Sequence, residues 1–453
     1  MVSSNKRLFS QPLSGIKIPG PAIIFLQWKI RRLYVIMKTY KEEKRMTIFK
    51  KWNSMSLILR IVIGMVIGAI LGFAAPGSAW IGLPGDLFVG ALKAIAPILV
   101  FLLVASALAN SKGGNMEKFR TVIFLYLFST LCAAIVSVFT SFAFRITIPL
   151  AGADAVDAAA VPQGMADVVM NLLKSVIVNP VDALANANYI GILFWAVVLG
   201  IALRHAGPAT KAMMEDLADA VSKSVRWVIS CAPFGILGLM YTAVATSGSE
   251  IFVRYGQLIA LLVGTMLFVA LVVNPLIVGL ILRHNPYPLV FRCLRQSGIT
   301  AFFTRSSAAN IPVNMQLCKE LGLDEDLYSV SIPLGSTINM DGAAVTITIF
   351  SLVAAFTVGV PVTIPMAIFL SIVATFSACG ASGVAGGSLM LVPLGCSLFG
   401  IPAGIAMQMV GVGFIIGVIQ DSLETALNSS GDVLFTATAE FAEWKKQGRK
   451  LPL

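Results

Sequence analysis

Six stretches of this chain are apolar over most of the length that a helix needs to cross a membrane. They are residues 57–75, 87–109, 121–144, 188–203, 227–247 and 257–282. A helix that spans a lipid bilayer needs about 20 mostly apolar residues. From residue 327 almost to residue 440 the apolar sequence continues, but polar and glycine-rich segments interrupt it repeatedly. The sequence therefore predicts a membrane protein with regular spans followed by an irregular last third.

The composition excludes most other classes of protein. Of the 453 residues, 57% are hydrophobic and only 12% are charged, whereas a soluble domain averages about 45–50% and about 25%. So few charged residues cannot cover the surface of a soluble multidomain enzyme, and a disordered, collagen-like or disulfide-stapled protein is also excluded. The 39 glycines and 21 prolines favour membrane helices that pack closely and are sometimes broken. The predicted fold class is an all-α polytopic membrane protein.

The net charge of +11 is distributed as a membrane topology signal and not as a nucleic-acid footprint. Short segments that carry Lys and Arg alternate with segments that carry few or none. The basic segments are 111–120, 204–226, 283–295 and the C-terminus, and the poor ones are 75–86 and 149–168. Because basic loops stay in the cytoplasm, both termini are predicted there. An even number of spans follows, and eight fits best.

Residues 1–45 do not continue this pattern. They are basic, and their longest apolar run, Pro21–Trp28, is too short to span a membrane. No classical cleavable signal peptide is evident in them. We predict a cytoplasmic N-terminal extension, with Met46 as a natural start of the membrane body.

The cysteines and histidines predict neither disulfides nor a zinc site. None of the six cysteines forms a CxxC pair, and most of them lie in apolar runs, as small core residues do. His205 and His284 each follow an Arg at the end of an apolar span. Loop positions are therefore expected for both histidines.

Four segments of the last third carry polar groups where the depth of the bilayer is expected. They are TRSSAANIP (304–312), STINMDGAA (336–344), SACGASGVAGGS (377–388) and QDSLETALNSSGD (420–432). Their ionisable residues are Arg305, Asp341, Asp421, Glu424 and Asp432. Each such group costs about 2.5–3.5 kcal/mol at the centre of a membrane helix. Solvated loops are the alternative, but the long apolar stretches around these residues favour functional positions inside the helix bundle.

The fourth segment has helical spacing. Asp421, Thr425, Asn428 and Asp432 follow one another at intervals that align them on one helix face, next to Glu424. Oxygen ligands of this kind suit a hard cation and not zinc or copper. Asn339, Asp341 and the carbonyls freed at the Asn-Met-Asp-Gly break are expected to complete the cation shells. An amphipathic helix with this face in water is the alternative.

The third segment is rich in glycine. Gly380, Gly383, Gly386 and Gly387 allow sharp backbone turns and leave amide N–H groups free. With Ser306 and Ser307 opposite, two hairpin tips would present N–H groups to an anionic ligand. Broken helices that meet at the bilayer midplane are typical of secondary transporters. A loose glycine linker is the alternative.

Together and in this order, the four segments resemble the dicarboxylate/amino acid:cation symporter family, which has the sodium-coupled glutamate-transporter fold. The similarity is greatest to the branch that carries serine and threonine, and it covers Met46 to Glu440. The resemblance implies eight transmembrane helices and two re-entrant helical hairpins, with AFFTRSSAANIPVNM in the first hairpin and ACGASGVAGGS at the tip of the second. It also implies a homotrimer in which a transport domain moves against a scaffold. The implied scaffold consists of residues 46–112 (helices 1–2) and 149–254 (helices 4–5). The implied transport domain consists of residues 113–148 (helix 3) and 255–445 (helices 6–8 and the hairpins). A tail, residues 446–453, follows it.

The resemblance assigns three sodium sites and a substrate site. One sodium site comprises Gly335, Asn339, Asn428 and Asp432; a deeper one comprises Tyr126, Ser129, Thr130, Asn339 and Asp341; a third comprises Thr337 and backbone around Ala378–Ala381. The implied substrate contacts are Ser306, Ser307, Gly383, Asp421, Glu424, Thr425 and Asn428.

The chain departs from the family members that carry acidic substrates. Glu424 replaces the Arg that pairs with a side-chain carboxylate, Ala343 replaces the Thr of NMDGT, and Ala385 replaces a Pro. A second carboxylate on the substrate would then lie unpaired, at a cost of several kcal/mol. Asp421 still suits the α-ammonium group of an amino acid. The amino acid that remains is small, neutral and polar, namely serine or threonine. Arg305 pairs with Glu424 or Asp421 and tunes the pocket, or it faces the cytoplasmic vestibule.

We therefore expect a symporter of the bacterial inner membrane that imports serine and threonine with sodium by alternating access. It would need no cofactor, since sodium is a coupled substrate, and it would not be an enzyme. One alternative is a sodium- or proton-coupled glutamate or dicarboxylate symporter of the same fold. A remote alternative is an intramembrane serine protease, because Gly380-Ala381-Ser382-Gly383 matches the pattern around a nucleophile. Its general base is missing, since neither histidine follows Ser382.

Overall fold

The chain is described by a computed structural model that covers residues 52, 54–110, 116–150, 170, 173–174, 176–379 and 386–452. The chain divides into two compact units, residues 1–60 and 61–453. The described helices belong to the second unit, except for the first four residues of α2 (57–60). The predicted N-terminal extension, residues 1–45, lies outside the described residues.

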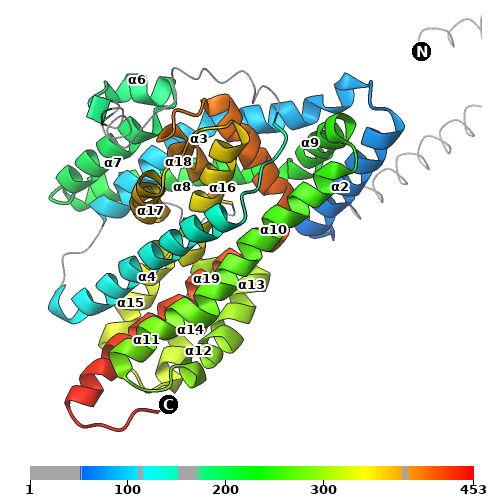
Figure 1. Cartoon of the computed structure of the whole chain (residues 1–453). Coiled ribbons are helices and arrows are strands. Elements are labelled where there is room, and N and C mark those ends of the chain that lie inside the picture. Colours follow the sequence, from blue (N-terminus) through cyan, green and yellow to red (C-terminus); the bar gives the residue numbers. More distant parts are fainter. Residues whose placement is uncertain are drawn as a thin grey trace, which may run out of the picture. The chain divides into compact units, whose positions relative to one another are not determined.

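The described residues form helices joined by short connections and no strand (Figure 1). In the first half of the chain these are α2 (Leu57–Ala74), η1 (Ala79–Ile81), α3 (Leu83–Ala109), α4 (Met116–Ala143), α6 (Pro180–Ala185), α7 (Tyr189–Leu203), α8 (Pro208–Ser230) and α9 (Ala232–Ser247). The second half contains α10 (Glu250–Phe268), η3 (Val269–Val273), α11 (Asn274–Leu282), α12 (Tyr287–Cys293), η4 (Leu294–Gly298), α13 (Ile299–Thr304), α14 (Ser307–Glu320), α15 (Glu325–Ile338), α16 (Asp341–Thr357), α17 (Ile364–Ala378), η5 (Leu389–Leu391), α18 (Val392–Ser397) and α19 (Ala403–Lys446).

Six helical stretches of the described chain are long and apolar enough to cross a membrane. They are Leu57–Ala74, Ala79–Ser106, Phe119–Ala143, Glu250–Leu282, Glu325–Thr357 and Ala403–Lys446. The pair α8 and α9, bent by 54° at Cys231, is a seventh candidate, whereas α7 and α17 are apolar but have only 15 residues each. The prediction of an all-α, multi-pass membrane protein is confirmed.

One predicted span differs from the structure. The apolar run 227–247 is interrupted at Cys231, and only α9 forms its apolar helix. Pro233 lies in the first turn of α9, where its missing N–H costs no helical hydrogen bond. The preceding helix α8 buries one face, with Met214, Ala218 and Val225, and exposes its charged face.

Helix α3 packs against α7, α8 and α9, and α2 packs against α9. The α2–α9 contact is close because α2 presents glycines to it: a Cβ on Gly64 would lie 2.1 Å from the carbonyl oxygen of Pro233, and one on Gly68 would lie 2.3 Å from that of Leu237. Small residues four apart allow membrane helices to approach backbone to backbone. The close packing expected from the glycine content is therefore present.

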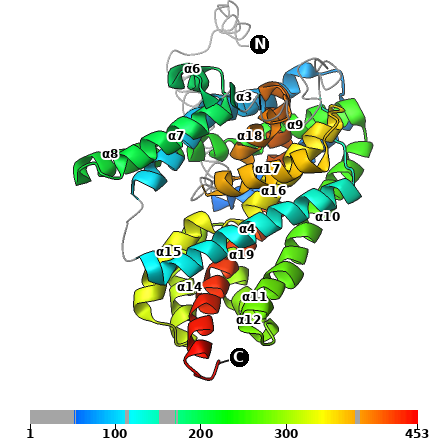
Figure 2. The same cartoon turned by 60° about the vertical axis from the view of Figure 1, so that its left-hand side comes forward.

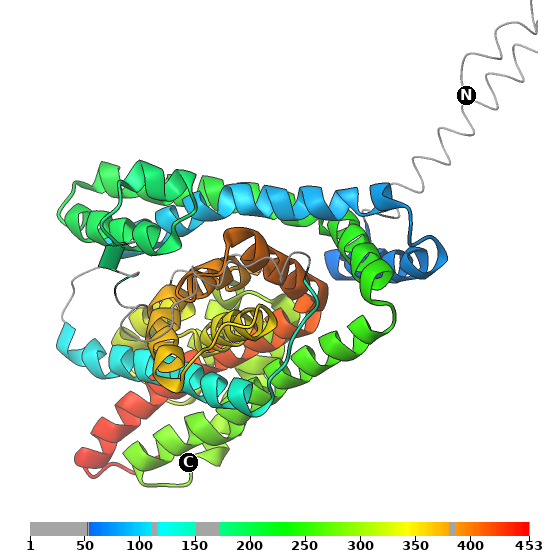
Figure 3. The same cartoon turned by 45° about the horizontal axis from the view of Figure 1, so that its top comes forward.

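Helix α19 contacts α10, α11 and each of α13 to α16 (Figure 2). Helix α16 is buried along most of its length and packs against α4, α17 and α18. Figure 3 shows α16, α17 and α18 (yellow to orange) between α4 (cyan) and α3 (blue). This arrangement brings polar segments that are far apart in the sequence to the same stretch of α19.

Two of the predicted breaks lie beside α19. Between α13 and α14 the chain turns at Arg305, whose φ of 52° is left-handed. Between α15 and α16 it turns at Asn339 and Met340, as the Asn-Met-Asp-Gly sequence predicts. Helix α19 continues unbroken through Asp421 and Asp432.

Candidate functional site

The polar face of α19 is buried. Asp421, Thr425, Asn428 and Asp432 have exposed fractions of 5%, 7%, 3% and 0%. Asp341 on α16 is also completely buried. The alternatives of a water-facing amphipathic helix and of solvated loop charges are therefore wrong for these residues, which lie inside the helix bundle.

The carboxylate of Asp341 is the centre of a first polar cluster. Its Oδ1 accepts hydrogen bonds from Ser129 Oγ at 2.9 Å and from Thr130 Oγ1 at 3.1 Å, both on α4. Its Oδ2 accepts a hydrogen bond from Asn274 Nδ2 at 2.9 Å. Both hydroxyls also lie within hydrogen-bond distance of the backbone carbonyl oxygen of Tyr126.

The Tyr126 side chain does not point into this cluster. Its hydroxyl pairs with Thr436 Oγ1 at 2.8 Å and reaches the backbone carbonyl oxygens of Ser331 and Asp432. Only the backbone carbonyl of Tyr126 is thus within reach of a cation at Asp341. The other predicted members of the set meet there, since Ser129 Oγ also lies 3.4 Å from Asn339 Oδ1.

A second cluster surrounds Asp432. Asn339 Nδ2 donates to the backbone carbonyl of Asn428 at 2.9 Å and to Asp432 Oδ1 at 3.1 Å. Gly335 approaches from α15 so closely that a Cβ there would lie 2.8 Å from Asp432 Oδ1. The structure therefore brings Gly335, Asn339, Asn428 and Asp432 together. Thr337 is separate, because its hydroxyl donates to Leu334 within its own helix.

Arg305 forms an ion pair with Asp421. Its Nη2 lies 2.6 Å and its Nε 2.7 Å from Asp421 Oδ2. The backbone N–H of Gly386 reaches Oδ1 of the same carboxylate at 3.4 Å. Of the three alternatives that the sequence leaves open for Arg305, the structure thus selects pairing with Asp421.

Glu424 accepts hydrogen bonds from three segments. Its Oε2 accepts from Gln420 Nε2 at 2.5 Å and from the hydroxyls of Thr346 and Ser388 at 2.8 Å each. These three donors were not predicted from the sequence. Only Gln420 carries a local signal, because it lies one helical turn before Glu424; the other two come from α16 and from the end of the glycine-rich segment.

These clusters consist of carboxylate, amide and hydroxyl groups. No group of three or more His, Cys, Asp or Glu side chains within the described part of the chain is arranged to hold a metal ion. Neutral oxygens around single carboxylates suit a hard monovalent or divalent cation better than a soft metal.

Comparison with known proteins identifies the family. The profile of the sodium:dicarboxylate symporter family matches residues 57–441. The chain belongs to this family. It is 58% identical over 402 residues to a protein of Bifidobacterium adolescentis named serine/threonine transporter SstT, an alignment that covers 88% of this chain and 93% of the relative. Proteins of the same name from Streptococcus thermophilus (59% identity, 87% and 98% coverage) and Streptococcus agalactiae (56%, 88% and 99%) are also similar to it.

The family resemblance seen in the four polar segments is thereby confirmed, and so is a transporter as opposed to an enzyme. The protease alternative loses its support, because almost the whole membrane body matches a symporter family. Its motif, like the predicted contact Gly383, lies outside the described residues.

The other predicted substrate contacts of this symporter lie at the start of α14 and on α19. Ser306 and Ser307 follow Arg305 directly and begin α14, where Ser306 Oγ accepts a hydrogen bond from the Ala309 N–H. Thr425 Oγ1 donates to the backbone carbonyl of Asp421 at 2.8 Å. Asn428 Oδ1 accepts from the Gly342 N–H at 2.7 Å, which ties α19 to the start of α16.

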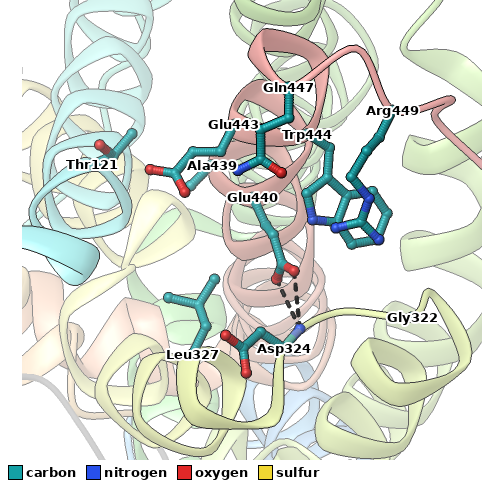
Figure 4. A pocket seen from close by; sticks show the side chains of 10 residues that line it. All are labelled: Thr121, Gly322, Asp324, Leu327, Ala439, Glu440, Glu443, Trp444, Gln447 and Arg449. Carbon is teal, nitrogen blue, oxygen red and sulfur yellow. Dashed lines mark hydrogen bonds between the residues drawn. The ribbon is translucent and has the colours of Figure 1, made fainter.

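The symporter also has a cavity of about 460 Å³ at the C-terminal end of α19 (Figure 4). There both carboxylate oxygens of Glu440 accept from the Asp324 N–H at 3.0 Å, and Arg449 lies over the ring of Trp444. None of the predicted site residues lines this cavity. The hydrogen bond between Glu440 and Asp324 ties the last turns of α19 to the start of α15.

Proposed function

We propose that this chain is a sodium-coupled symporter that imports serine and threonine. Its family is one of sodium symporters, and relatives that are 56–59% identical carry the name serine/threonine transporter. The proposed substrate rests on one observation, the pair of buried carboxylates Asp421 and Glu424. Within the described chain, only Asp421 has a cationic partner.

Asp421 is proposed to bind the α-ammonium group of the substrate. The α-carboxylate would be bound by N–H groups near Ser306, Ser307 and the hairpin tip at Gly383, with Thr425 and Asn428 completing the site. Glu424 lies one turn from Asp421, and a substrate side chain beside it must be neutral or donate a hydrogen bond. Serine and threonine meet both conditions, whereas aspartate would bring a second carboxylate next to Glu424.

Sodium is proposed to bind in the two oxygen clusters. Asp341 would bind one ion with Ser129, Thr130, Asn339 and the carbonyl of Tyr126. Asp432 would bind another with carbonyls of Gly335, Asn339 and Asn428. A buried carboxylate is costly unless it is paired, and Na⁺ supplies the missing positive charge. A third ion at Thr337 and the backbone around Ala378–Ala381 follows from the family resemblance alone.

The proposed architecture has eight transmembrane segments and two re-entrant hairpins. The segments are α2, α3, α4, α7, α8–α9, α10–α11, α15–α16 and α19, and the hairpins are α12–α14 and α17–α18. Residues 46–112 and 149–254 would form the scaffold of a homotrimer, and residues 113–148 and 255–445 the moving transport domain. Both termini, the extension 1–45 and the tail 446–453 would lie in the cytoplasm beneath a bacterial inner membrane.

Uptake of labelled serine by proteoliposomes tests this function. With an inward sodium gradient we expect uptake that collapses when potassium or choline replaces sodium. An inside-negative potential should accelerate uptake, since moving one net positive charge inward gains about 2.3 kcal/mol per 100 mV. Uptake that is unchanged by the cation exchange refutes the coupling.

Competition separates the two candidate substrate classes. We expect excess threonine to inhibit serine uptake strongly and excess glutamate to inhibit it little. The reverse order favours a glutamate or dicarboxylate symporter of the same fold.

A further inference from the structure

Asn274 is a polar residue inside an otherwise apolar helix. It is the only polar side chain between Thr265 and Arg283. It begins α11 directly after the π-helical turn Val269–Val273 and is followed by Pro275. Turns of this type are frequent at functional sites because the extra residue changes which side chains face the interior. Neither the sequence motifs nor the family resemblance assigns a role to Asn274.

The side chain of Asn274 contacts the Asp341 cluster. Its Nδ2 donates to Asp341 Oδ2 at 2.9 Å, while Ser129 and Thr130 donate to Oδ1. Asn274 is 2% exposed and Asp341 is completely buried. Three donors from two helices therefore hold the two carboxylate oxygens, and Asn274 alone holds Oδ2 among the described residues.

The amide oxygen of Asn274, unlike its amide nitrogen, makes no hydrogen bond within the described chain. It is also buried. The small cavity beside it, which Ser430 and Gly431 also line, measures about 10 Å³ and is at the lower limit for one water molecule. A buried amide whose oxygen has no hydrogen-bond partner destabilises a fold more than an apolar side chain would. Packing alone therefore does not explain an asparagine here, and its one hydrogen bond points to Asp341.

We propose that Asn274 is a positioning residue of the sodium site at Asp341. By donating to Oδ2 it fixes the rotation of the carboxylate, so that Oδ1 stays beside the Ser129 and Thr130 hydroxyls and faces a bound sodium ion. Groups that orient a metal ligand in this way typically change metal affinity by about 10–100-fold when they are removed. This inference rests on the proposed sodium-coupled function.

The test measures sodium binding and transport separately. Sodium binding is followed in purified, detergent-solubilised full-length protein as the rise of the melting temperature with sodium concentration, in the absence of serine. Transport is followed as sodium-dependent serine uptake in proteoliposomes. For Asn274→Ala and for the nearly isosteric Asn274→Leu we expect the sodium half-saturation, which is the sodium concentration that gives half of the maximal effect, to rise about 10–100-fold in both measurements. At saturating sodium the maximal uptake rate should change far less.

Ile277→Ala is the matched control. Ile277 lies one turn further along α11, is 7% exposed and packs in an apolar cluster. The substitution should lower the melting temperature of the sodium-free protein and leave the sodium half-saturation within about twofold of the wild-type value.

The outcomes separate the inference from the proposed function. Sodium half-saturation that is unchanged in Asn274→Leu, or shifted equally in Ile277→Ala, overturns the positioning role. A wild-type protein that neither gains stability from sodium nor takes up serine overturns the proposed function itself.

Discussion

Arg305 and Asp421, which are 116 residues apart in the sequence, form a partly buried ion pair. The guanidinium lies 2.6 Å from the carboxylate, and their side chains are 19% and 7% exposed. Arg305 reaches Asp421 from a left-handed turn, a backbone conformation that costs a non-glycine residue energy. If Asp421 binds the α-ammonium group of serine, substrate and Arg305 compete for the same carboxylate.

Arg305→Gln tests this competition. Without the guanidinium, Asp421 is free for the substrate ammonium, and the half-saturation for serine should fall by about tenfold or more, because a hydrogen bond to a charged group contributes about 1.5–3 kcal/mol. The substrate-free protein should lose about 3–5 kcal/mol of stability, since a buried carboxylate remains without its partner. Serine should therefore raise the melting temperature more in the variant than in the wild type.

Arg292→Gln is the control for this experiment. Arg292 and Glu320 are 3.5 Å apart with side chains 34% and 41% exposed, and such exposed pairs contribute little. An Arg305→Gln protein with the same serine half-saturation and stability as Arg292→Gln contradicts the competition.

Gly431→Ala should disturb the Asp432 cluster. A Cβ at this position would lie 2.6 Å from Asn339 Nδ2, which donates to Asn428 and Asp432. Displacement of this amide should raise the sodium half-saturation of serine uptake and cost about 1–3 kcal/mol of stability. A Cβ at Gly417 on the same helix would meet nothing within 4 Å. Gly417→Ala should therefore neither raise the sodium half-saturation nor lower the stability. Equal sodium dependence in the two variants would refute the role of the Asn339 amide.

Tyr126→Phe distinguishes a backbone ligand from a side-chain ligand. The hydroxyl points to Thr436 and away from Asp341, and it contacts Asp432 only at the backbone carbonyl, which is not among the proposed sodium ligands. Its removal should therefore leave the sodium half-saturation unchanged. The melting temperature should fall, because a buried hydroxyl with good partners contributes about 1–2 kcal/mol. Tyr189→Phe is the control, since the Tyr189 hydroxyl is buried without a partner among the described residues. A sodium half-saturation that shifts only in Tyr126→Phe would place the hydroxyl among the ligands.

Local sequence signals predicted the elements that position the site. Apolar length predicted the regular spans, and the spacing of Asp421, Thr425, Asn428 and Asp432 predicted their common face on α19, because both are properties of a single helix. The turn at Asn339 and Met340 was predictable for the same reason. A continuous apolar run concealed the break at Cys231, since hydropathy does not register a bend.

Several partners that come from other helices were not predictable from local signals. Pairing with Asp421 was one of three alternatives for Arg305, because the choice depends on how the turn after α13 lies against α19, and no periodicity encodes that placement. Glu424 collects its donors from three separate segments, and neither Thr346 nor Ser388 differs from its neighbours in a way that marks it as a donor. Asn274 gave no signal because a single asparagine in an apolar run has no repeating partner. The direction of the Tyr126 side chain likewise follows from packing and not from its motif.

Glu424→Gln tests why the substrate side chain should be neutral. The substitution keeps the size of the side chain and a carbonyl oxygen for the Gln420, Thr346 and Ser388 donors, but it removes the negative charge. Two like charges about 5 Å apart repel by about 3 kcal/mol at an effective dielectric constant of 20. Aspartate should therefore inhibit serine uptake at a concentration at least about tenfold lower in Glu424→Gln than in the wild type. Glu440→Gln alters another buried glutamate of α19, at the cavity far from Asp421, and should leave aspartate inhibition unchanged. Aspartate inhibition that is equally weak in all three proteins would show that the charge of Glu424 does not set the choice of substrate.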